Sequence, residues 1–504
     1  MNYTIKEIQK ALMSGEITSV ELVKKSIETF ESDKKSSQPL NAFLEIYADA
    51  VSKAEEADKL IQDAKSKGAA EVEKLFAEKP LLGMPFANKD NISAKGKKLT
   101  CASKILEGYV APYNATVINR LENAGAIPLG RCNQDEFAMG SSTEYSVYGA
   151  TRNPINKDYV SGGSSGGSAA AVSSNQALFG IGTETGGSVR LPASYCGIYG
   201  LKPTYGVLSR WGVVAYGSSL DQVGLLGHTP ADIAEPLSLM CGVDTFDDTS
   251  ADLPNVDSIK NLSALSDDEF KSLKIAIPAQ FLKTDGADAD VVKCFEETRA
   301  WFENKGAKIE VVDLPILDAS IASYYVIALS EAASNLSRFD GIRYGFRAEN
   351  VENLLDLYKE TRAQGFGDEV KRRIMLGTYS LSAGTYDAYY KKAQQVRTLI
   401  KQDFDKVLAD YDVIVGPTAP TPAFKIGENV EDPLTMYAND ILTIPINLAG
   451  LPAISIPCGF EDGMPLGLQI IGNYFDESTI YRVAHVYEQS TDFHKQTPQI
   501  WEGK

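Results

Sequence analysis

Short apolar runs recur along most of the chain, with segments of helical periodicity between them. The runs are LLGMPFA, GAIPLG, ALFGIG, SLKIAIP, YDVIVGP, PAISIP and LGLQIIG. A strand that is buried on both faces reads as a short continuous apolar run, because neither of its faces meets water. Alternation of such strands with helices is typical of a buried sheet that has helices packed against it. The pattern therefore predicts an α/β fold.

The N-terminal region is predicted to be helical. Residues 4–7 (TIKE) and 18–21 (TSVE) both have the capping-box sequence that begins helices, and apolar residues recur at helical spacing after the second box. Residues 51–79 are rich in Ala, Glu and Lys, which predicts a mostly solvated helical stretch that ends at Pro80.

No linker-like segment divides the chain. We therefore expect a single domain over residues 1–504, in which residues 1–79 form the N-terminal helical region and residues 80–504 form a catalytic core. Residues 244–268 are polar, acidic and rich in turn-forming residues. This composition predicts a surface excursion between two parts of one fold.

The composition excludes several classes of protein. A chain of 504 residues that is 44% hydrophobic can bury a large core. Its formal net charge is −18, whereas a protein that binds long nucleic acids by itself normally presents a basic face. Charges scattered through the first thirty or so residues leave no apolar run of the length that a signal peptide or membrane span needs. We expect a cytoplasmic protein that neither enters a membrane nor binds long nucleic acids directly.

The cysteines indicate neither a disulfide framework nor a metal site. They lie far apart in the sequence and form no CxxC pair, which suits reduced thiols. We therefore predict no bound metal. The six cysteines are Cys101, Cys132, Cys196, Cys241, Cys294 and Cys458.

Two loops rich in glycine and serine are the main candidates for a functional site, GGSSGGS at residues 162–168 and TGGSVR at residues 185–190. The first loop matches the G-x-S-x-G nucleophile elbow, but that motif follows a strand, and the preceding NPINKDYV contains Pro and Asn. The Gly-Lys-Ser/Thr ending of a phosphate-binding loop is also absent. Taken alone, the first loop is as well explained by a flexible turn.

The second loop has a context that favours chemistry. ALFGIGTET is predicted to form a strand that leads directly into Gly186, Gly187 and Ser188. Because glycine has no Cβ, its backbone can approach a reacting carbonyl closely. Consecutive backbone amides in such a position are suited to an oxyanion hole.

A nucleophilic serine needs a base, and the three histidines are poor candidates. His228 lies in a predicted loop, His485 in a predicted surface helix, and His494 just beyond that helix. Lys89 in GMPFANKDNI is a better candidate, because burial disfavours the ammonium form and favours a neutral base. Ser-Lys pairs replace Ser-His pairs in some hydrolases. Taken alone, Lys89 could also be a surface lysine with a buried stem.

Taken together, GMPFANKDNI, GGSSGGS and TGGSVR resemble the motifs of the amidase signature family. The resemblance implies the α/β fold of that family, with a large mixed central β-sheet covered by helices on both faces. It also implies a Ser-Ser-Lys triad, in which Ser188 is the nucleophile, Ser164 is the bridging serine and Lys89 is the base. The bridging serine of the family follows a cis peptide bond.

The resemblance implies a mechanism for amide hydrolysis. Neutral Lys89 would draw a proton through Ser164 while Ser188 attacks an amide carbonyl. The backbone amides of Thr185, Gly186, Gly187 and Ser188 would hold the oxyanion. Ammonia or an amine would then leave, and water would hydrolyse the acyl-enzyme.

Further segments resemble one group within the family, the glutaminase subunits of tRNA-dependent amidotransferases. This implies a heterotrimer with B and C subunits, in which our chain hydrolyses glutamine to glutamate and supplies ammonia. The partner would hold the tRNA and, with ATP and magnesium, convert Glu-tRNA(Gln) to Gln-tRNA(Gln), while this chain needs no cofactor. The segments are DEFAMGSSTE, SNLSRFDGIRYG, KRRIMLGTY, GPTAPTPAF, PLTMYANDILTIPINLAGLP and LGLQIIG.

The resemblance also indicates substrate-binding residues. Free glutamine carries an α-ammonium and an α-carboxylate, so a specific pocket needs an acidic residue and an arginine. By motif position, Asp440 in YANDIL and Arg373 in KRRIML match the residues that hold these groups, and Tyr324 in SYYVIAL matches a neighbour. Without the resemblance, an arginine in a KRR run predicts a solvated helix face.

Three features depart from the pattern of the family. Glu184 stands before the TGGS loop where Asp is common, and Leu225 in SLDQVGLLG stands where Pro is common. The segment at residues 64–79 is longer than the corresponding segment of the family. The extra methylene of Glu184 could change how the oxyanion loop is held, which would affect the rate rather than the class of reaction.

Two other functions stay open at this stage. The chain could be a free-standing amidase that acts on another amide without a partner. It could also be a non-catalytic scaffold, although Lys89, Ser164 and Ser188 are all present.

Overall fold

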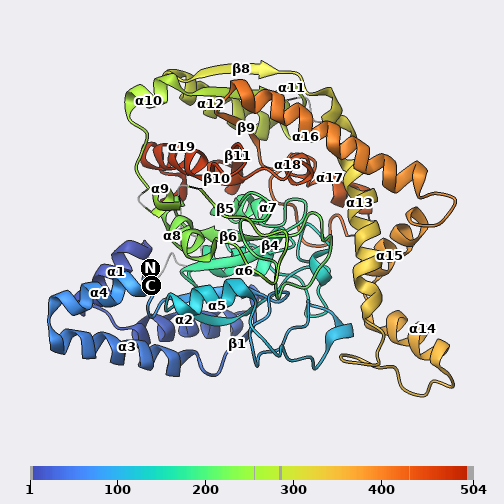
Figure 1. Cartoon of the computed structure of the whole chain (residues 1–504), viewed down its shortest axis with the longest axis horizontal. Coiled ribbons are helices and arrows are strands. Elements are labelled where there is room, and N and C mark those ends of the chain that lie inside the picture. Colours follow the sequence, from blue (N-terminus) through green and yellow to red (C-terminus); the bar gives the residue numbers. More distant parts are fainter. Residues whose placement is uncertain (1–3, 255, 261, 283–286, 431, 496–504) are drawn as a thin grey trace.

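The computed structural model describes residues 4–254, 256–260, 262–282, 287–430 and 432–495. An 11-stranded sheet runs through this part of the chain in the order β1-β3-β2-β4-β6-β5-β10-β11-β9-β7-β8 (Figure 1). It mixes parallel pairs, such as β2 with β3 and β4, with antiparallel pairs, such as β10 with β11. The strands are β1 (Phe43–Ile46), β2 (Pro85–Lys89), β3 (Ile127–Cys132), β4 (Phe179–Glu184), β5 (Tyr199–Lys202), β6 (Gln222–Gly227), β7 (Lys274–Pro278), β8 (Lys308–Val312), β9 (Val413–Pro417), β10 (Ala453–Glu461) and β11 (Met464–Ile471).

All seven apolar runs contribute strands, so the predicted α/β fold with a buried mixed sheet is confirmed. The sequence did not reveal β1, β5, β6 and β8. Strands β1 and β8 lie at the two edges of the sheet, and most residues of β8 are partly or fully exposed, so neither needs a continuous apolar run. Strands β5 and β6 contain glycines, which resemble turn signals in a sequence.

The helices cover the sheet and confirm the opening helical region. Thr4 and Thr18 cap α1 and α2 with the expected capping boxes, and residues 51–79 fall in two helices that are separated at Gly68. The longer helices are α1 (Ile5–Ser14), α2 (Ser19–Lys34), α3 (Ala50–Lys67), α4 (Ala69–Glu78), α5 (Thr116–Asn123), α6 (Gly166–Ser173), α8 (Pro230–Met240), α12 (Ala289–Asn304), α13 (Ser320–Asn335), α14 (Leu354–Gly365), α15 (Asp368–Ser380), α16 (Lys392–Asp410) and α19 (Glu477–Ser490). Shorter ones are α7 (Arg190–Tyr195), α9 (Val256–Lys260), α10 (Asp267–Ser272), α11 (Ala279–Leu282), α17 (Pro433–Ala438) and α18 (Ile444–Ala449).

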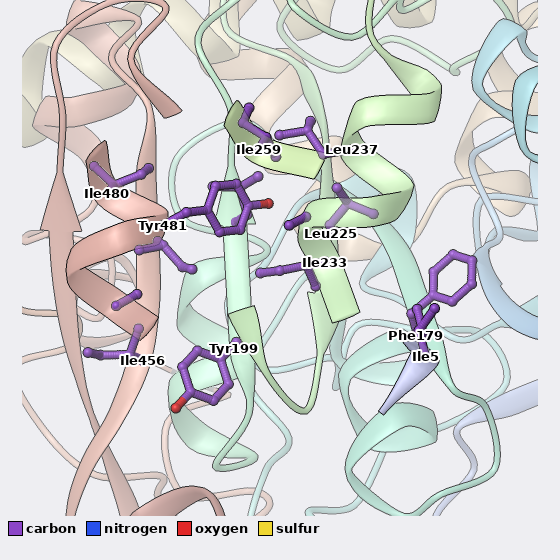
Figure 2. Packing of buried hydrophobic residues seen from close by; sticks show 14 of the residues in the cluster. Ile5, Phe179, Tyr199, Leu225, Ile233, Leu237, Ile259, Ile456, Ile480 and Tyr481 are labelled. Carbon is purple, nitrogen blue, oxygen red and sulfur yellow. The ribbon is translucent and has the colours of Figure 1, made fainter. Parts of the chain in front are cut away.

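Apolar cores lie on both faces of the sheet. In β9, Val413 and Val415 belong to one core and Ile414 to the other, because successive side chains of a strand point to opposite faces. Figure 2 shows part of the first core, where Tyr199 and Leu225 of the sheet lie with Tyr481 of α19. The sheet is therefore a central layer with helices on both sides.

Most of the described residues in 244–268 are exposed, as expected for a surface excursion, but the segment is anchored by a few buried side chains. Ile259 of α9 is 1% exposed and belongs to the first core, and Figure 2 shows it beside Leu237 of α8. The side chains of Asp244 and Asp247 are also largely buried, and they accept hydrogen bonds from Ser209 and Arg210 of a neighbouring loop. The acidic composition in this segment therefore partly reflects internal hydrogen bonding.

The segment Pro315–Arg338, which contains α13, has the length and apolar composition of a membrane span. Half of its most apolar window is buried inside the protein, where α13 packs against α15, α16 and α18. Its apolar character is therefore explained by its place in the core.

A glycine sets the distance between α13 and α15, which carry Tyr324 and Arg373 respectively. A Cβ built on Gly377 of α15 would lie 1.9 Å from the carbonyl oxygen of Leu329 in α13. No larger residue fits this contact without displacing one helix.

We predict that Gly377→Ala destabilises the protein. Overpacking costs about 1–3 kcal/mol, which exceeds the gain of about 1 kcal/mol in helix propensity when alanine replaces glycine. The free energy of unfolding in urea measures the effect. Gly384→Ala is the control, because a Cβ at Gly384 meets no atom within 4 Å. Equal stability of Gly377→Ala and the wild type would contradict the packing argument.

Candidate active site

Lys89 is buried at the end of β2, beside the start of the oxyanion loop. Strands β2 and β4 are parallel neighbours, so their carboxyl ends lie at the same edge of the sheet. The Lys89 Nζ atom donates hydrogen bonds to Ser164 Oγ and Ser165 Oγ, both at 2.8 Å, and to the Thr183 carbonyl oxygen at 3.2 Å. The predicted lysine and the first predicted serine are thus in direct contact.

Burial lowers the pKa of Lys89 into the range that a general base needs at neutral pH. Its side chain is 0% exposed, and this desolvation lowers the pKa of Lys89 to about 7, although the nearby Asp135 and Asp221 carboxylates oppose the shift. A substantial neutral fraction is therefore present at neutral pH. A surface lysine would remain almost fully protonated under the same conditions.

Ser164 lies in a tight turn that only small residues can form. The peptide bond between Gly163 and Ser164 is cis. A Cβ on Gly163 would lie 2.2 Å from Asp135 Oδ2, and that carboxylate accepts the backbone N–H groups of Thr143 and Tyr145. Close packing therefore requires the glycines of GGSSGGS: Gly163 and Gly166 pack against the 135–145 segment, Gly162 against Pro192 and Gly167 against Asn133.

The TGGS loop follows β4 and brings Ser188 next to the Ser164 turn. The Ser165 backbone N–H donates to the Ser188 carbonyl oxygen at 3.0 Å. Gly187 has φ +151°, and a Cβ there would lie 2.3 Å from Thr443 Oγ1. Backbone contact therefore joins the two serine loops, while a direct contact between the Ser164 and Ser188 hydroxyls stays a prediction.

Glu184 secures the far side of the same loop. Its Oε2 atom accepts the backbone N–H groups of Val189 and Arg190 at 3.0 Å, and its Oε1 atom accepts Arg190 Nε at 2.7 Å. Burial would raise the pKa of Glu184, but the buried Arg190 guanidinium outweighs burial and lowers it. The glutamate that departs from the family pattern thus makes two backbone contacts and an ion pair at the start of α7. Leu225, the second departure, is a core residue of β6.

Asp440 presents one unpaired oxygen to the TGGS loop. Its Oδ2 atom accepts Ser141 Oγ at 2.5 Å, whereas Oδ1 is buried and has no hydrogen-bond partner among the described residues. A Cβ on Gly187 would lie 3.0 Å from this Oδ1 atom. Burial raises the pKa of Asp440 to about 7. A cationic group placed at Oδ1 would satisfy the oxygen and stabilise the carboxylate.

Arg373 is buried among aromatic rings and is not on a solvated helix face. It is 3% exposed, and its guanidinium lies 5.1 Å from the ring centroid of Tyr437 and 5.6 Å from that of Tyr325. Its Nε atom donates to Glu369 and its Nη1 atom to the Tyr216 hydroxyl. Burial would lower the pKa of Arg373, but these neighbours hold it above its ordinary value. Within the described part of the chain Nη2 has no hydrogen-bond partner.

Tyr324 of α13 lies between Arg373 and the TGGS loop. A Cβ on Gly186 would lie 2.6 Å from the Tyr324 hydroxyl oxygen, so this hydroxyl rests directly on the loop. Tyr324 is also a neighbour of the Tyr216 hydroxyl that pairs with Arg373. Tyr324 and Asp440 therefore lie against the loop that carries Ser188, and Arg373 is linked to it through Tyr216 and Tyr324.

Sequence reasoning missed several residues of the site. Asp135 and Ser141 both lie within the quoted DEFAMGSSTE segment, but nothing in its sequence distinguished them from their neighbours. Glu369 precedes Arg373 by one helical turn, a spacing that signals an ion pair. Asp221 lies in the quoted SLDQVGLLG segment, where only its Leu225 drew attention.

The histidines are remote from this chemistry. His485 contacts Glu488 and Gln489 of its own helix, and His228 lies in the turn after β6. Across the described ranges no hydrogen bond joins a histidine to Lys89, Ser164 or Ser188.

One acidic group elsewhere has the spacing of a cation site. Asp288, Asp290 and Glu461, at the start of α12 and the end of β10, place one oxygen each within 4.8 Å of one another. In the sheet, β10 is separated from β2, which carries Lys89, by three other strands. This acidic group is therefore not part of the candidate active site.

Comparison with known proteins agrees with this geometry. A family model described as Amidase matches residues 25–481. The chain is 56% identical over 504 residues to the A subunit of glutamyl-tRNA(Gln) amidotransferase from Lysinibacillus sphaericus (99% of this chain, 98% of the relative) and 53% identical over 501 residues to that of Bacillus licheniformis (99% of each).

Solved structures show the same fold. The crystal structure of the A subunit of glutamyl-tRNA(Gln) amidotransferase from Thermotoga maritima has a TM-score of 0.77 and 38% identity, over 99% of this chain and 98% of that one. The native peptide amidase of Stenotrophomonas maltophilia has a TM-score of 0.81 and 28% identity, over the same shares of the two chains.

We predict that amidase activity rises with pH through about 7, because Lys89 can accept a proton only when its amine is neutral. Lys89→Arg should lower kcat roughly 10²–10⁴-fold, since a guanidinium stays protonated at every accessible pH. The measurement is kcat at saturating substrate on both sides of neutral pH, which separates Lys89 from Asp440, whose charge affects binding. Substantial activity in Lys89→Arg would place the base elsewhere.

Proposed function

The chain belongs to the amidase family, and from this premise we propose that it is the glutaminase, or A, subunit of a glutamyl-tRNA(Gln) amidotransferase. The relatives that share 52–58% of its sequence carry that name, whereas the similar peptide amidase shares 28%. The observation that carries the proposal is the unpaired Asp440 oxygen beside Gly187, because free glutamine brings an α-ammonium group that this oxygen can bind.

The proposed reaction is hydrolysis of the side-chain amide of glutamine. Neutral Lys89 accepts a proton from Ser164, Ser164 takes the proton of Ser188, and Ser188 Oγ attacks the amide carbon. The backbone amides of residues 185–188 hold the oxyanion, and each well-placed donor contributes roughly 10²–10³-fold in rate. The same proton relay then protonates the leaving nitrogen, so that ammonia departs and a γ-glutamyl ester of Ser188 remains.

The second half of the reaction repeats these roles with water. A water molecule loses its proton through Ser164 to Lys89 and attacks the ester carbonyl. The tetrahedral intermediate collapses, Ser188 regains its proton and glutamate is released. Lys89 returns to its neutral form, so the cycle consumes one water and one glutamine and yields glutamate and ammonia.

Two charged side chains support the choice of glutamine as substrate. We propose that Asp440 Oδ1 binds the α-ammonium and that Arg373, through its unpaired Nη2 atom, binds the α-carboxylate. Glu369 already pairs with Arg373 at 2.7 Å, which fixes the orientation of the guanidinium. Tyr324 lies between the loop and Arg373 and lines the path between the two ends of the substrate.

The remaining parts of the proposal concern assembly. We propose that the chain is a single domain, since one sheet joins the N-terminal region to the rest, and that it works in the cytoplasm with B and C subunits. The partner would hold the tRNA and use ATP and magnesium to amidate Glu-tRNA(Gln) with the ammonia that this chain releases. The net charge of −18 supports tRNA binding through the partner.

We predict that Asp440→Asn raises the KM for glutamine at least roughly tenfold, because a hydrogen bond to a charged group contributes about 1.5–3 kcal/mol. Amidation of Glu-tRNA(Gln) with added free ammonia should be unchanged in the assembled complex, since ammonia bypasses this site. Asp432→Asn is the matched control. It changes an exposed carboxylate that caps α17, just before Asp440, and should leave both reactions unchanged.

Two results would contradict the proposal. Equal loss of the glutamine-dependent and ammonia-dependent reactions in Asp440→Asn would assign the residue to assembly or folding. Absence of ammonia-dependent amidation in the wild-type preparation, together with hydrolysis of other amides, would identify a free-standing amidase.

A further inference from the structure

We propose that Asp221 is a positioning residue that holds the oxyanion loop and the substrate-binding Arg373 in a fixed relation. The inference rests on the proposed function, because it assigns Thr185 to the oxyanion loop and Arg373 to the glutamine pocket. Asp221 is 5% exposed and directly precedes β6. Among the described residues it forms no hydrogen bond with Lys89, Ser164 or Ser188, so it would position the site through the groups that it does contact.

One oxygen of Asp221 reaches the oxyanion loop. Asp221 Oδ1 accepts the Thr185 hydroxyl at 2.7 Å and the Gly217 backbone N–H at 3.0 Å. Thr185 is the first residue after β4 and the first of the four whose amides line the proposed oxyanion hole. The position of its backbone is therefore tied to the carboxylate through its own side chain.

The other oxygen reaches the Arg373 side of the site. Asp221 Oδ2 accepts the Tyr216 backbone N–H at 2.7 Å, and the Tyr216 hydroxyl accepts Arg373 Nη1 at 2.8 Å. The guanidinium also lies 5.8 Å from the centroid of the Tyr216 ring. A shift of the turn that contains Tyr216 would thus move the hydroxyl and the ring against which the Arg373 guanidinium lies.

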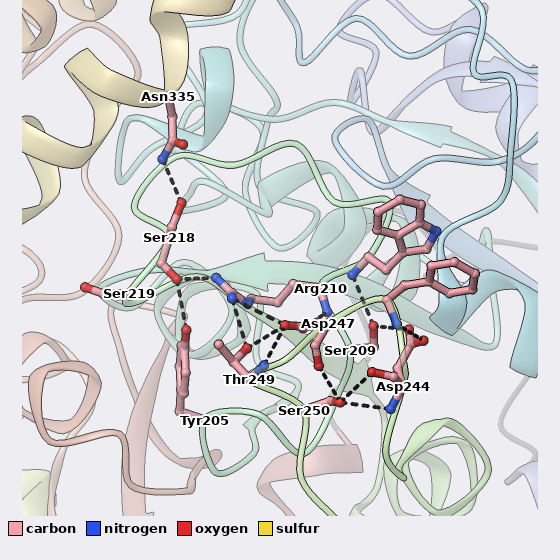
Figure 3. A network of polar contacts seen from close by, with 12 residues as sticks. Tyr205, Ser209, Arg210, Ser218, Ser219, Asp244, Asp247, Thr249, Ser250 and Asn335 are labelled. Atoms are coloured by element: carbon pink, nitrogen blue, oxygen red, sulfur yellow. Dashed lines mark hydrogen bonds and ion pairs between the residues drawn. The ribbon is translucent and has the colours of Figure 1, made fainter.

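Hydrogen bonds from other segments hold the 216–221 turn in place, so the position of Asp221 is itself fixed. Asn335 of α13 donates to the Tyr216 carbonyl oxygen at 3.1 Å and to Ser218 Oγ at 2.9 Å. Figure 3 shows Asn335 reaching Ser218 from one side while Arg210 and Tyr205 reach it from the other. The next residue, Ser219, is held by Glu331 and Arg397.

A carboxylate is required because all three partners are donors. Asp221→Asn offers one oxygen and one NH₂ group, so either the Tyr216 N–H or the Gly217 N–H faces another donor. The turn must then move away from the loop, the guanidinium or both. Displacement of reacting groups by a fraction of an ångström to 1 Å lowers rates by up to about 10²-fold.

The test measures glutamate release by the purified complex of this chain with its partner subunits. Thr185→Val removes only the hydroxyl donor and should lower kcat roughly tenfold to a hundredfold with little change in KM. Thr185→Ser keeps the donor and should retain most of kcat. Asp221→Asn should lower kcat by a similar factor and also raise KM for glutamine several-fold, since it disturbs both the contact with Thr185 and the Tyr216 contact that supports Arg373.

Asp232→Asn is the matched control for a merely structural effect. Asp232 is also a buried aspartate whose two oxygens accept a backbone N–H and a threonine hydroxyl, but it serves α1 and α8, remote from the site. It should reduce stability while leaving kcat and KM of the folded protein unchanged.

The outcomes distinguish this inference from the proposed function. Wild-type kcat and KM in folded Asp221→Asn would overturn the inference, and so would a loss of kcat in Asp221→Asn that Thr185→Val does not share. If Asp221→Asn fails to fold, the kcat of Thr185→Val relative to Thr185→Ser decides the matter. A wild-type complex that cleaves other amides but not glutamine would contradict the proposed function, and the Thr185 comparison would then be made with that amide.

Discussion

The removal of the Lys89 amine from water is the interaction on which the rest of the site depends. Desolvation brings its pKa to about 7, so a substantial fraction of the amine is neutral and able to accept a proton from Ser164 at neutral pH. The surrounding structure must exclude water from the amine and still satisfy its hydrogen bonds. The Ser164 and Ser165 hydroxyls and the Thr183 carbonyl accept these hydrogen bonds, which explains why both positions are serines.

The loops around Lys89 are closely packed. Gly163, Gly186 and Gly187 all lie where a Cβ would meet another side chain within 2.6 Å, so these loops have no space for larger residues. The neighbouring Asp135, Asp221 and Glu184 carboxylates are used as acceptors for backbone N–H groups. These buried acids hold the loops, and their charges moderate the fall in the lysine pKa.

The sequence predicted the parts of this structure that leave a local signal. Apolar runs marked seven strands, the capping boxes at Thr4 and Thr18 marked the first helices, and motif resemblance marked the lysine, the serines and the candidate substrate residues. The contacts between distant segments left no such signal. Ser141 with Asp440, and Asp221 with Thr185, are joined only by the tertiary fold, and the aromatic surroundings of Arg373 contradict what its KRR context alone suggests.

The central claim is that Ser188 carries the acyl group. The most direct measurement is to incubate the wild-type complex with glutamine labelled in its carbon skeleton, quench it with acid and identify the modified peptide by mass spectrometry. The account predicts a γ-glutamyl ester on Ser188 and none in Ser188→Ala, which loses only the attacking oxygen. Label on Ser164 or on a cysteine, or undiminished label in Ser188→Ala, would contradict the account.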